Sequence, residues 1–180
     1  MPENVNVPLD ASPGARIATA VETFGESVVA DRAAALLGGS NEGEEFLLWV
    51  GGRHAKGILD GAPALYWPEV WGARALQYAW DDSASAAIER GLGNQAWRVR
   101  EMCGKVVAQR GLPYADALVP LLGDEVARVR AVAARAIGFV GEYEHVVQLR
   151  TLLTDAEVEV RRSAGDALRA AAVRLDRTIE

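Results

Sequence analysis

Apolar residues recur at helical spacing along most of the chain, and in its second half the same pattern returns at a fixed interval. Four windows can be superposed at steps of 31, 30 and 31 residues, namely 68–76, 99–107, 129–137 and 160–168. A repeat of this length is typical of stacked helical units, because one unit cannot bury its apolar face alone. The sequence therefore predicts an all-α protein built from repeated units.

The last three copies share a turn that precedes the longer helix of each copy. The turns read Leu-Gly-Asn, Leu-Gly-Asp and Leu-Thr-Asp, and they end at Asn94, Asp124 and Asp155. Four residues before each turn leucine lies another apolar residue, at the i, i+4 spacing of a helix. Each copy is therefore predicted to be a short helix, a tight turn and a longer helix.

The region before the clear repeats is also helical in pattern. Apolar spacing predicts three further helices there, over residues 17–24, 28–37 and 46–50. Residues 1–13 contain three prolines and show no helical period, so we expect a flexible N-terminal arm. The rest, residues 14–180, is predicted to be a single helical repeat domain, with clear repeats over 83–172 and degenerate units over 14–82.

The third copy carries the run Arg-Val-Arg-Ala-Val-Ala-Ala-Arg-Ala-Ile-Gly over residues 128–138. This run resembles the HEAT-repeat family in its short bacterial version, which includes the repeats of phycobilisome-lyase-type proteins. The resemblance is strong over residues 83–172, weaker over 62–82 and not visible before about residue 60. It implies a right-handed α-solenoid of stacked antiparallel helix pairs. The first copy departs at Pro68 and Glu69, as a boundary unit with an atypical face would.

Helix geometry divides each longer helix into a buried and an exposed side. The residues predicted to be exposed are Arg98, Glu101 and Lys105, then Arg128, Ala131 and Arg135, and finally Glu159, Arg162 and Asp166. If these helices line a concave surface, as the resemblance implies, their cations form a basic patch on a chain of net charge −6. We expect this patch to contain Arg98, Lys105, Arg128 and Arg135, with Arg74 beside them. An ordinary solvated helix face is the alternative interpretation.

A second set of arginines follows the shared valine directly in the last three copies. The resemblance implies that they form a hydrogen-bond ladder between units with the polar residues of the turns, the members being Arg100, Arg130 and Arg161 with Asn94, Asp124 and Asp155. Bidentate geometry favours arginine over lysine for such a role. We expect Asp124 and Arg130 to share hydrogen bonds, and the ladder to be structural.

Aromatic residues gather around the first copy: Tyr66, Trp67, Trp71, Tyr78, Trp80 and Trp97. Trp71 occupies a core position of the repeat and should be buried. Packing explains most of the others, whereas a partly exposed Trp67 or Trp97 would be an anchor for a partner, because its ring offers a large contact area at little entropic cost.

The sequence shows no pattern of catalytic or metal-binding residues. His54 and His145 lie 91 residues apart, neither has a second ligand at metal spacing, and glycine-rich phosphate loops are absent. Cys103 is the only cysteine and stands in a small core position. We predict no catalytic residues, no cofactor and no metal. Because neither a secretory signal nor a long apolar run is present, we also predict a cytoplasmic protein without membrane contact.

Three functions are compatible with these patterns. We favour a non-enzymatic scaffold or adaptor, whose concave face binds another protein through an acidic segment. The second is nucleic-acid binding or base excision, since some helical-repeat DNA glycosylases have a similar architecture. An isoelectric point near 5.1 and the acidic residues of the last copy argue against a long basic track for phosphates. The third is a chromophore-lyase role, which requires a pigment-containing host.

Overall fold

The computed structural model describes residues 6–179, and within this range all regular secondary structure is helical. The prediction of an all-α fold is therefore confirmed. The chain divides into two compact units, residues 1–88 and 89–180, and the boundary lies within α6 (Ser85–Gly91). It falls close to residue 83, where the clear repeats were predicted to begin. That residues 14–180 form one domain stays a prediction, and each unit is described by itself.

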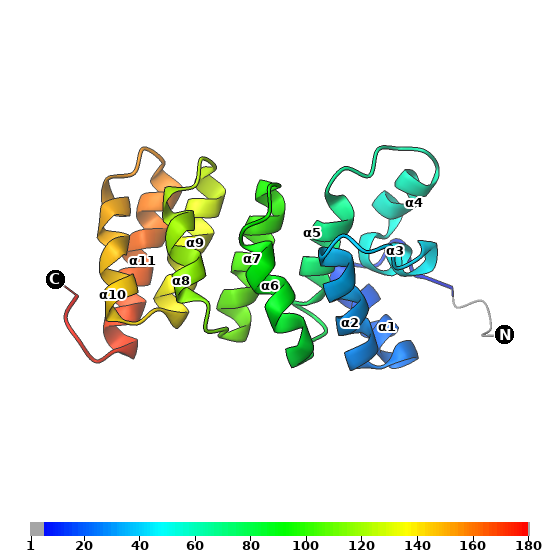
Figure 1. Ribbon diagram of the computed structural model, residues 1–180, viewed down its shortest axis with the longest axis horizontal. Coiled ribbons are helices and arrows are strands. Elements are labelled where there is room, and N and C mark those ends of the chain that lie inside the picture. Colours follow the sequence, from blue (N-terminus) through cyan, green and yellow to red (C-terminus); the bar gives the residue numbers. More distant parts are fainter. Residues whose placement is uncertain (1–5, 180) are drawn as a thin grey trace. The chain divides into compact units, whose positions relative to one another are not determined.

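The first unit consists mainly of five helices. They are α1 (Pro13–Phe24), α2 (Glu26–Leu37), α3 (Glu44–Gly51), α4 (Arg53–Leu59) and α5 (Trp67–Ala75), followed by the short 3₁₀ helix η1 (Asp82–Ala84) (Figure 1). The three helices predicted over residues 17–24, 28–37 and 46–50 are confirmed as α1, α2 and α3. Helix α5 packs against α2, and α1 packs against α2 and α3.

Buried aromatic residues fill the core of the first unit. Trp49 and Trp71 are among its largest fully buried side chains, so the core position predicted for Trp71 is confirmed. Gly72 allows α5 to approach α2 closely, because a Cβ atom there would lie only 2.6 Å from the Ala33 carbonyl oxygen. The break between α1 and α2 lies at Gly25, whose φ of 89° is readily adopted only by glycine.

Part of the predicted N-terminal arm has defined partners. Residues 1–5 lie outside the described residues. Further along, Asp10 forms an ion pair with Arg53 of α4. The carbonyl oxygen of Ala11 accepts a hydrogen bond from the buried guanidinium group of Arg16 in α1. These contacts connect the residues that lead into α1 to the rest of the first unit.

The second unit repeats the order that the sequence predicted. Its elements are α7 (Trp97–Arg110), α8 (Ala115–Leu118), η2 (Val119–Gly123), α9 (Ala127–Val140), α10 (Tyr143–Val146), η3 (Val147–Thr154) and α11 (Val158–Arg174) (Figure 1). A short helical segment, a turn and a longer helix thus alternate. Helix α9 packs against both α7 and α11. Close contact with α11 depends on Gly138, where an added Cβ atom would lie 2.8 Å from the Cβ atom of Ala167.

The predicted buried sides of the longer helices are largely confirmed. Val99, Cys103 and Ile137 are fully buried. Two of the residues predicted to be exposed are buried instead: Ala131 is fully enclosed, and Glu101 is only 6% exposed. The reason for the first error is that α9 has helical neighbours on two sides, which leaves it a narrower free face than one amphipathic pattern suggests. The second error arises because two cations cover Glu101.

Candidate functional site

The three turns of the repeats are held by their own polar residues. Oδ1 of Asn94, Asp124 and Asp155 accepts a hydrogen bond from the backbone N–H group two residues further on, at 2.8, 2.9 and 2.9 Å. Such turns let Asn and Asp replace a backbone acceptor before the first helical residue. The side chain therefore fixes the chain direction just before each longer helix.

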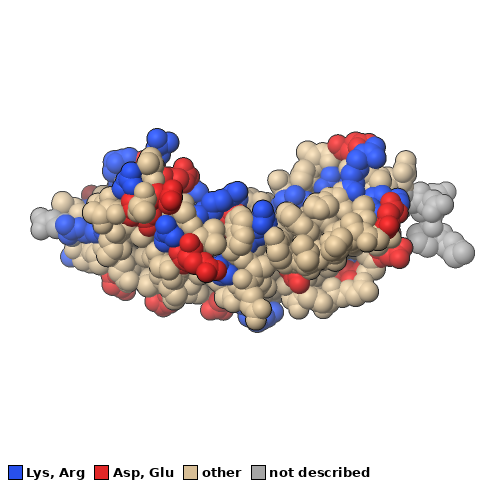
Figure 2. All heavy atoms as spheres, turned by 90° about the horizontal axis from the view of Figure 1, so that it is seen from above, with Lys and Arg blue, Asp and Glu red and all other residues tan. Residues whose placement is uncertain are grey.

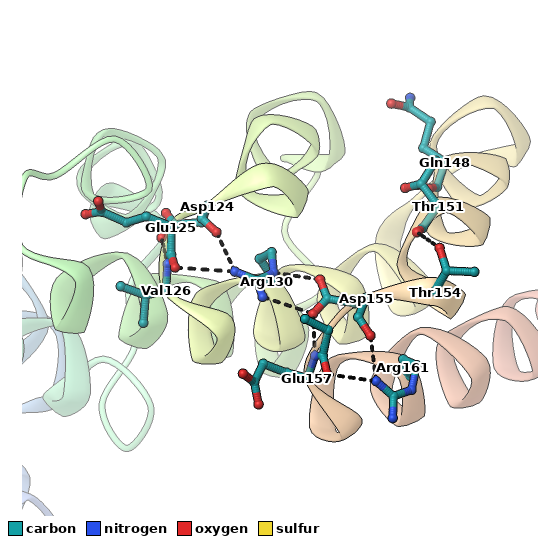
Figure 3. A network of polar contacts seen from close by, with 11 residues as sticks. Asp124, Glu125, Val126, Arg130, Gln148, Thr151, Thr154, Asp155, Glu157 and Arg161 are labelled. Carbon is teal, nitrogen blue, oxygen red and sulfur yellow. Dashed lines mark hydrogen bonds and ion pairs between the residues drawn. The ribbon is translucent and has the colours of Figure 1, made fainter.

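Arginines on the longer helices connect each of these turns to the next. Arg100 donates from Nε and Nη2 to the carboxylate of Asp124 at 2.8 and 3.0 Å. Arg130 donates to Asp155 through the same atoms at the same distances (Figure 3). All four side chains are largely buried, with exposed fractions between 6 and 16%. Two successive rungs of identical geometry thus join the copies.

The remaining guanidinium nitrogen of each arginine binds its own turn. Nη1 of Arg100, Arg130 and Arg161 donates to the backbone carbonyl oxygens of Asn94, Asp124 and Asp155 at 2.8, 2.8 and 2.6 Å. The pairing that we expected between the side chains of Asp124 and Arg130 is therefore wrong. In Arg100 and Arg130, Nη1 donates to the turn of the same copy. Nε and Nη2, on the other side of the guanidinium group, therefore donate to the carboxylate of the following copy. The partner of the Asp124 carboxylate is Arg100.

The ion pair between Arg130 and Asp155 changes the pKa of both side chains. Hydrogen bonds from Arg130 lower the pKa of Asp155, and the same bonds raise the pKa of Arg130. Asp155 therefore stays ionised in more acidic solution than a free aspartate would. The hydrogen bonds of Arg100 and Arg130 connect one turn to the next, as a structural ladder requires, and the structural role of the ladder stays a prediction.

Four of the five cations predicted for the partner-binding patch lie on α7 and α9, and the buried carboxylate of Glu101 contacts two of these four. Oε1 of Glu101 accepts from Nη2 of Arg128 at 2.9 Å and lies 3.0 Å from Nζ of Lys105. Lys105 and Arg128 are 38 and 65% exposed, whereas the carboxylate between them is covered. Their head groups are thereby held in place on the surface.

Trp97 extends this cluster at the start of α7. The guanidinium carbon of Arg98 lies 4.2 Å from the centre of the Trp97 ring system, and that of Arg128 lies 5.6 Å from it. Both distances are within the range of cation–π attraction between a guanidinium group and an aromatic ring. The side chains of Trp97 and Arg98 are themselves half-buried. A partly exposed aromatic ring is therefore flanked by two cations, as the anchor interpretation of Trp97 requires.

Arg135 joins α9 to α11 beside this cluster. Its Nη1 donates to Glu159 and to the hydroxyl oxygen of the buried Ser163, both at 3.0 Å.

Four cations of this surface, Arg98, Lys105, Arg128 and Arg135, thus face two carboxylates. On the face drawn in Figure 2, blue and red side chains are likewise intermixed over the C-terminal end. The surface carries an excess of positive charge that is smaller than the sequence alone suggested. We name these four cations, together with Trp97, the α7–α9 face.

Two predicted partner-binding residues belong to the first unit. Nη2 of Arg74 donates to the Val50 carbonyl oxygen at 2.8 Å, and the buried Arg16 donates to the carbonyl oxygens at the same end of α3. Burial lowers the pKa of Arg74, and the nearby charge of Arg16 lowers it further. Arg74 therefore helps to cap α3. Trp67 is half-buried and stacks on Trp71, with ring centres 6.2 Å apart.

Two residues with catalytic potential, Cys103 and His145, lie in the second unit. Cys103 is fully buried, and burial raises the pKa of its thiol, which disfavours the reactive thiolate. Nε2 of His145 lies 3.0 Å from Asp116, and Nδ1 accepts from the backbone N–H of Glu142. In residues 6–179 no three His, Cys, Asp or Glu side chains are grouped closely enough to hold a metal ion.

Two features of the second unit were not predicted from the sequence. Glu101 is a buried acceptor, and the only signal for it was a single acidic residue among the cations of one helix face. Phe139 lies at the end of α9 and is 59% exposed. Its position is not part of the shared core of the repeat. A large apolar residue at such a position was the signal in the sequence that could have revealed its exposure.

Within the described part of the chain, none of the helices combines the length and the apolar character that a membrane crossing requires. Searches against family models and against curated proteins gave no match for this sequence.

Proposed function

We propose that this chain is a non-enzymatic protein-interaction module of HEAT-like, right-handed solenoid architecture, and that its α7–α9 face binds an acidic segment of another protein. Three observations support the architecture. The short and long helices alternate, α9 packs against α7 and α11, and the arginine rungs join successive turns in one geometry. Repeats with contacts between neighbours only are the physical basis of such a stack.

One observation carries the proposed binding function. The α7–α9 face presents Arg98 and Arg128 beside Trp97, and the Glu101 carboxylate that pairs with Arg128 and Lys105 is buried. Buried Glu101 holds the cations in position without presenting negative charge to solvent. On a chain of net charge −6, a local cationic face attracts an acidic segment while the rest of the molecule repels general polyanions.

A peptide selection tests this function. The immobilised chain is offered a phage library of random dodecapeptides, and enriched sequences are synthesised with a fluorescent label. We expect the enriched peptides to be rich in Asp and Glu, and their affinity to fall as salt is raised. Enrichment of neutral or basic peptides, or no enrichment, would contradict the proposal.

The matched variants remove charge without changing the fold. Arg128→Gln with Arg135→Gln should weaken binding of an enriched peptide by about tenfold at low salt, at an unchanged helical circular dichroism spectrum. Neutral glutamine is preferred to Glu at position 128, because a second carboxylate beside buried Glu101 would itself destabilise the protein. The control is Arg90→Gln with Arg150→Gln, two exposed arginines on α6 and η3 that do not belong to the α7–α9 face, and it should leave affinity unchanged.

A binding assay with duplex DNA tests the main alternative function, nucleic-acid binding. We expect it to bind weakly or not at all near physiological salt. Tight DNA binding that is sensitive to salt and lost in the Arg128→Gln, Arg135→Gln variant would replace the adaptor function with nucleic-acid binding.

A further inference from the structure

An apolar pocket lies between α7 and α9, next to the charged residues of the α7–α9 face. Its volume is about 310 Å³, and its lining residues are Lys105, Ala108, Gln109, Val132, Arg135 and Phe139. This volume is at the small end of the range for ligand pockets, which is about 300–1,000 Å³. The size suits a single side chain better than a whole small molecule.

Phe139 is the most unusual residue of this pocket. The repeat register aligns it with Gln109 in the preceding copy and with Ala170 in the following one, so packing between copies does not require a large apolar side chain there. Even so, 59% of Phe139 is exposed to solvent. Aromatic residues, Phe included, are enriched in protein interfaces relative to the rest of the surface.

Charge at the rim of the pocket selects the kind of partner. Lys105 and Arg135 line the pocket and are 38 and 45% exposed. Each already contacts one carboxylate, Glu101 and Glu159 respectively. An ammonium group carries three N–H donors and a guanidinium group carries about five, so both side chains retain donors for a further carboxylate. An apolar residue followed or preceded by Asp or Glu therefore complements the pocket and its rim.

We propose that this pocket takes one apolar side chain, of the size of Leu, Met or Phe, from the acidic segment that binds the α7–α9 face. The side chain packs against Phe139 and Val132, and carboxylates beside it contact Lys105 and Arg135. This inference rests on the proposed function, to which it adds a sequence requirement: acidic residues around a single apolar anchor. The charges then mainly set the association rate, and the apolar anchor mainly sets the dissociation rate of the complex.

The test repeats the dodecapeptide selection against Phe139→Ala and compares it with the parent chain. We expect parent-selected peptides to share one Leu, Met or Phe among acidic residues, and Phe139→Ala to lose this preference. Replacing the anchor of a synthetic peptide by Ala should weaken binding to the parent by about tenfold. The same replacement should matter little to Phe139→Ala, since the pocket wall is then already missing.

Two further variants exclude indirect effects. Ala108→Leu fills the pocket without removing Phe139, and should weaken the anchored peptide while leaving its Ala-substituted version unchanged. Val158→Ala is the control, because Val158 is also 59% exposed but does not line the pocket. It should bind both peptides as the parent does. Circular dichroism confirms that each variant is folded.

The outcomes separate this inference from the function on which it rests. If acidic peptides bind in a salt-sensitive manner that Arg128→Gln with Arg135→Gln abolishes, but no apolar residue is selected, the anchor pocket is refuted and the function stands. If no acidic peptide is enriched, both are refuted. An anchored peptide that binds Phe139→Ala as tightly as the parent also refutes the pocket.

Discussion

Arg130 should couple energetically to Asp155 of the following turn and not to Asp124 of its own turn, although both aspartates occupy the same position of the repeat. The perturbation is a double-mutant cycle of Arg130→Met and Asp155→Asn. Asparagine at position 155 still offers Oδ1 to the Glu157 N–H group, so the turn is preserved and the loss is confined to the charge pair. Methionine retains most of the length of the arginine side chain.

The expected coupling follows from the burial of the pair. Hydrogen bonds to charged groups contribute about 1.5–3 kcal/mol to stability, whereas exposed ion pairs contribute about 0.2–1 kcal/mol. Arg130 and Asp155 are 16 and 9% exposed and share two hydrogen bonds, which places them between these cases. We therefore expect a coupling free energy of about 1–2 kcal/mol.

The assay is urea denaturation, followed by circular dichroism and tryptophan fluorescence to check that both report the same transition. The control cycle pairs Arg130→Met with Asp124→Asn, and it should give a coupling free energy below about 0.5 kcal/mol. Equal coupling in the two cycles, or a value below about 0.5 kcal/mol for Arg130 with Asp155, would refute the forward-reaching ladder.

Three further predictions concern the same unit. Gly138→Ala should destabilise by about 1–3 kcal/mol because its Cβ atom would press on α11, whereas Gly165→Ala, whose Cβ atom would meet nothing nearer than 3.6 Å, should stabilise by up to about 1 kcal/mol; urea denaturation measures both. Ile137→Ala should cost about 2–5 kcal/mol in the same assay, and a loss below about 1 kcal/mol would contradict its core position. Because the pKa of Asp155 is lowered in the folded state, its contribution is fully present above about pH 4 and is lost as the pH falls through the folded-state pKa. The difference in stability between the parent and Asp155→Asn should therefore shrink below about pH 4, and a constant difference would contradict the charge pair.

Sequence periodicity predicted the helical elements well because helix formation is governed by local spacing. The windows around Val99, Val129 and Val160 place the longer helices correctly, and Trp71 and Ile137 are buried as their positions in the repeat require. Periodicity describes one helix at a time, however. It therefore missed the burial of Ala131, which depends on a second neighbouring helix.

The candidate site was predictable only in part, because side-chain partners depend on which copies are brought together. The sequence identified the cations of the α7–α9 face, yet Glu101 beneath them was predicted to be exposed. In the ladder it identified the participating residue types, but the choice between a partner in the same turn and one in the next depends on the reach of the arginine side chain. Arg130 reaches Asp155, and only the three-dimensional arrangement reveals this pairing.

The most direct test of the proposed binding function is to map an enriched acidic peptide on the chain by two-dimensional ¹H–¹⁵N NMR titration. We predict that the shifts concentrate on α7 and α9, including the indole N–H of Trp97 and the backbone N–H of Phe139, and that they diminish as salt is raised. Shifts confined to residues 6–88, or spread along α8 and α10 with Trp97 unaffected, would contradict binding at the α7–α9 face.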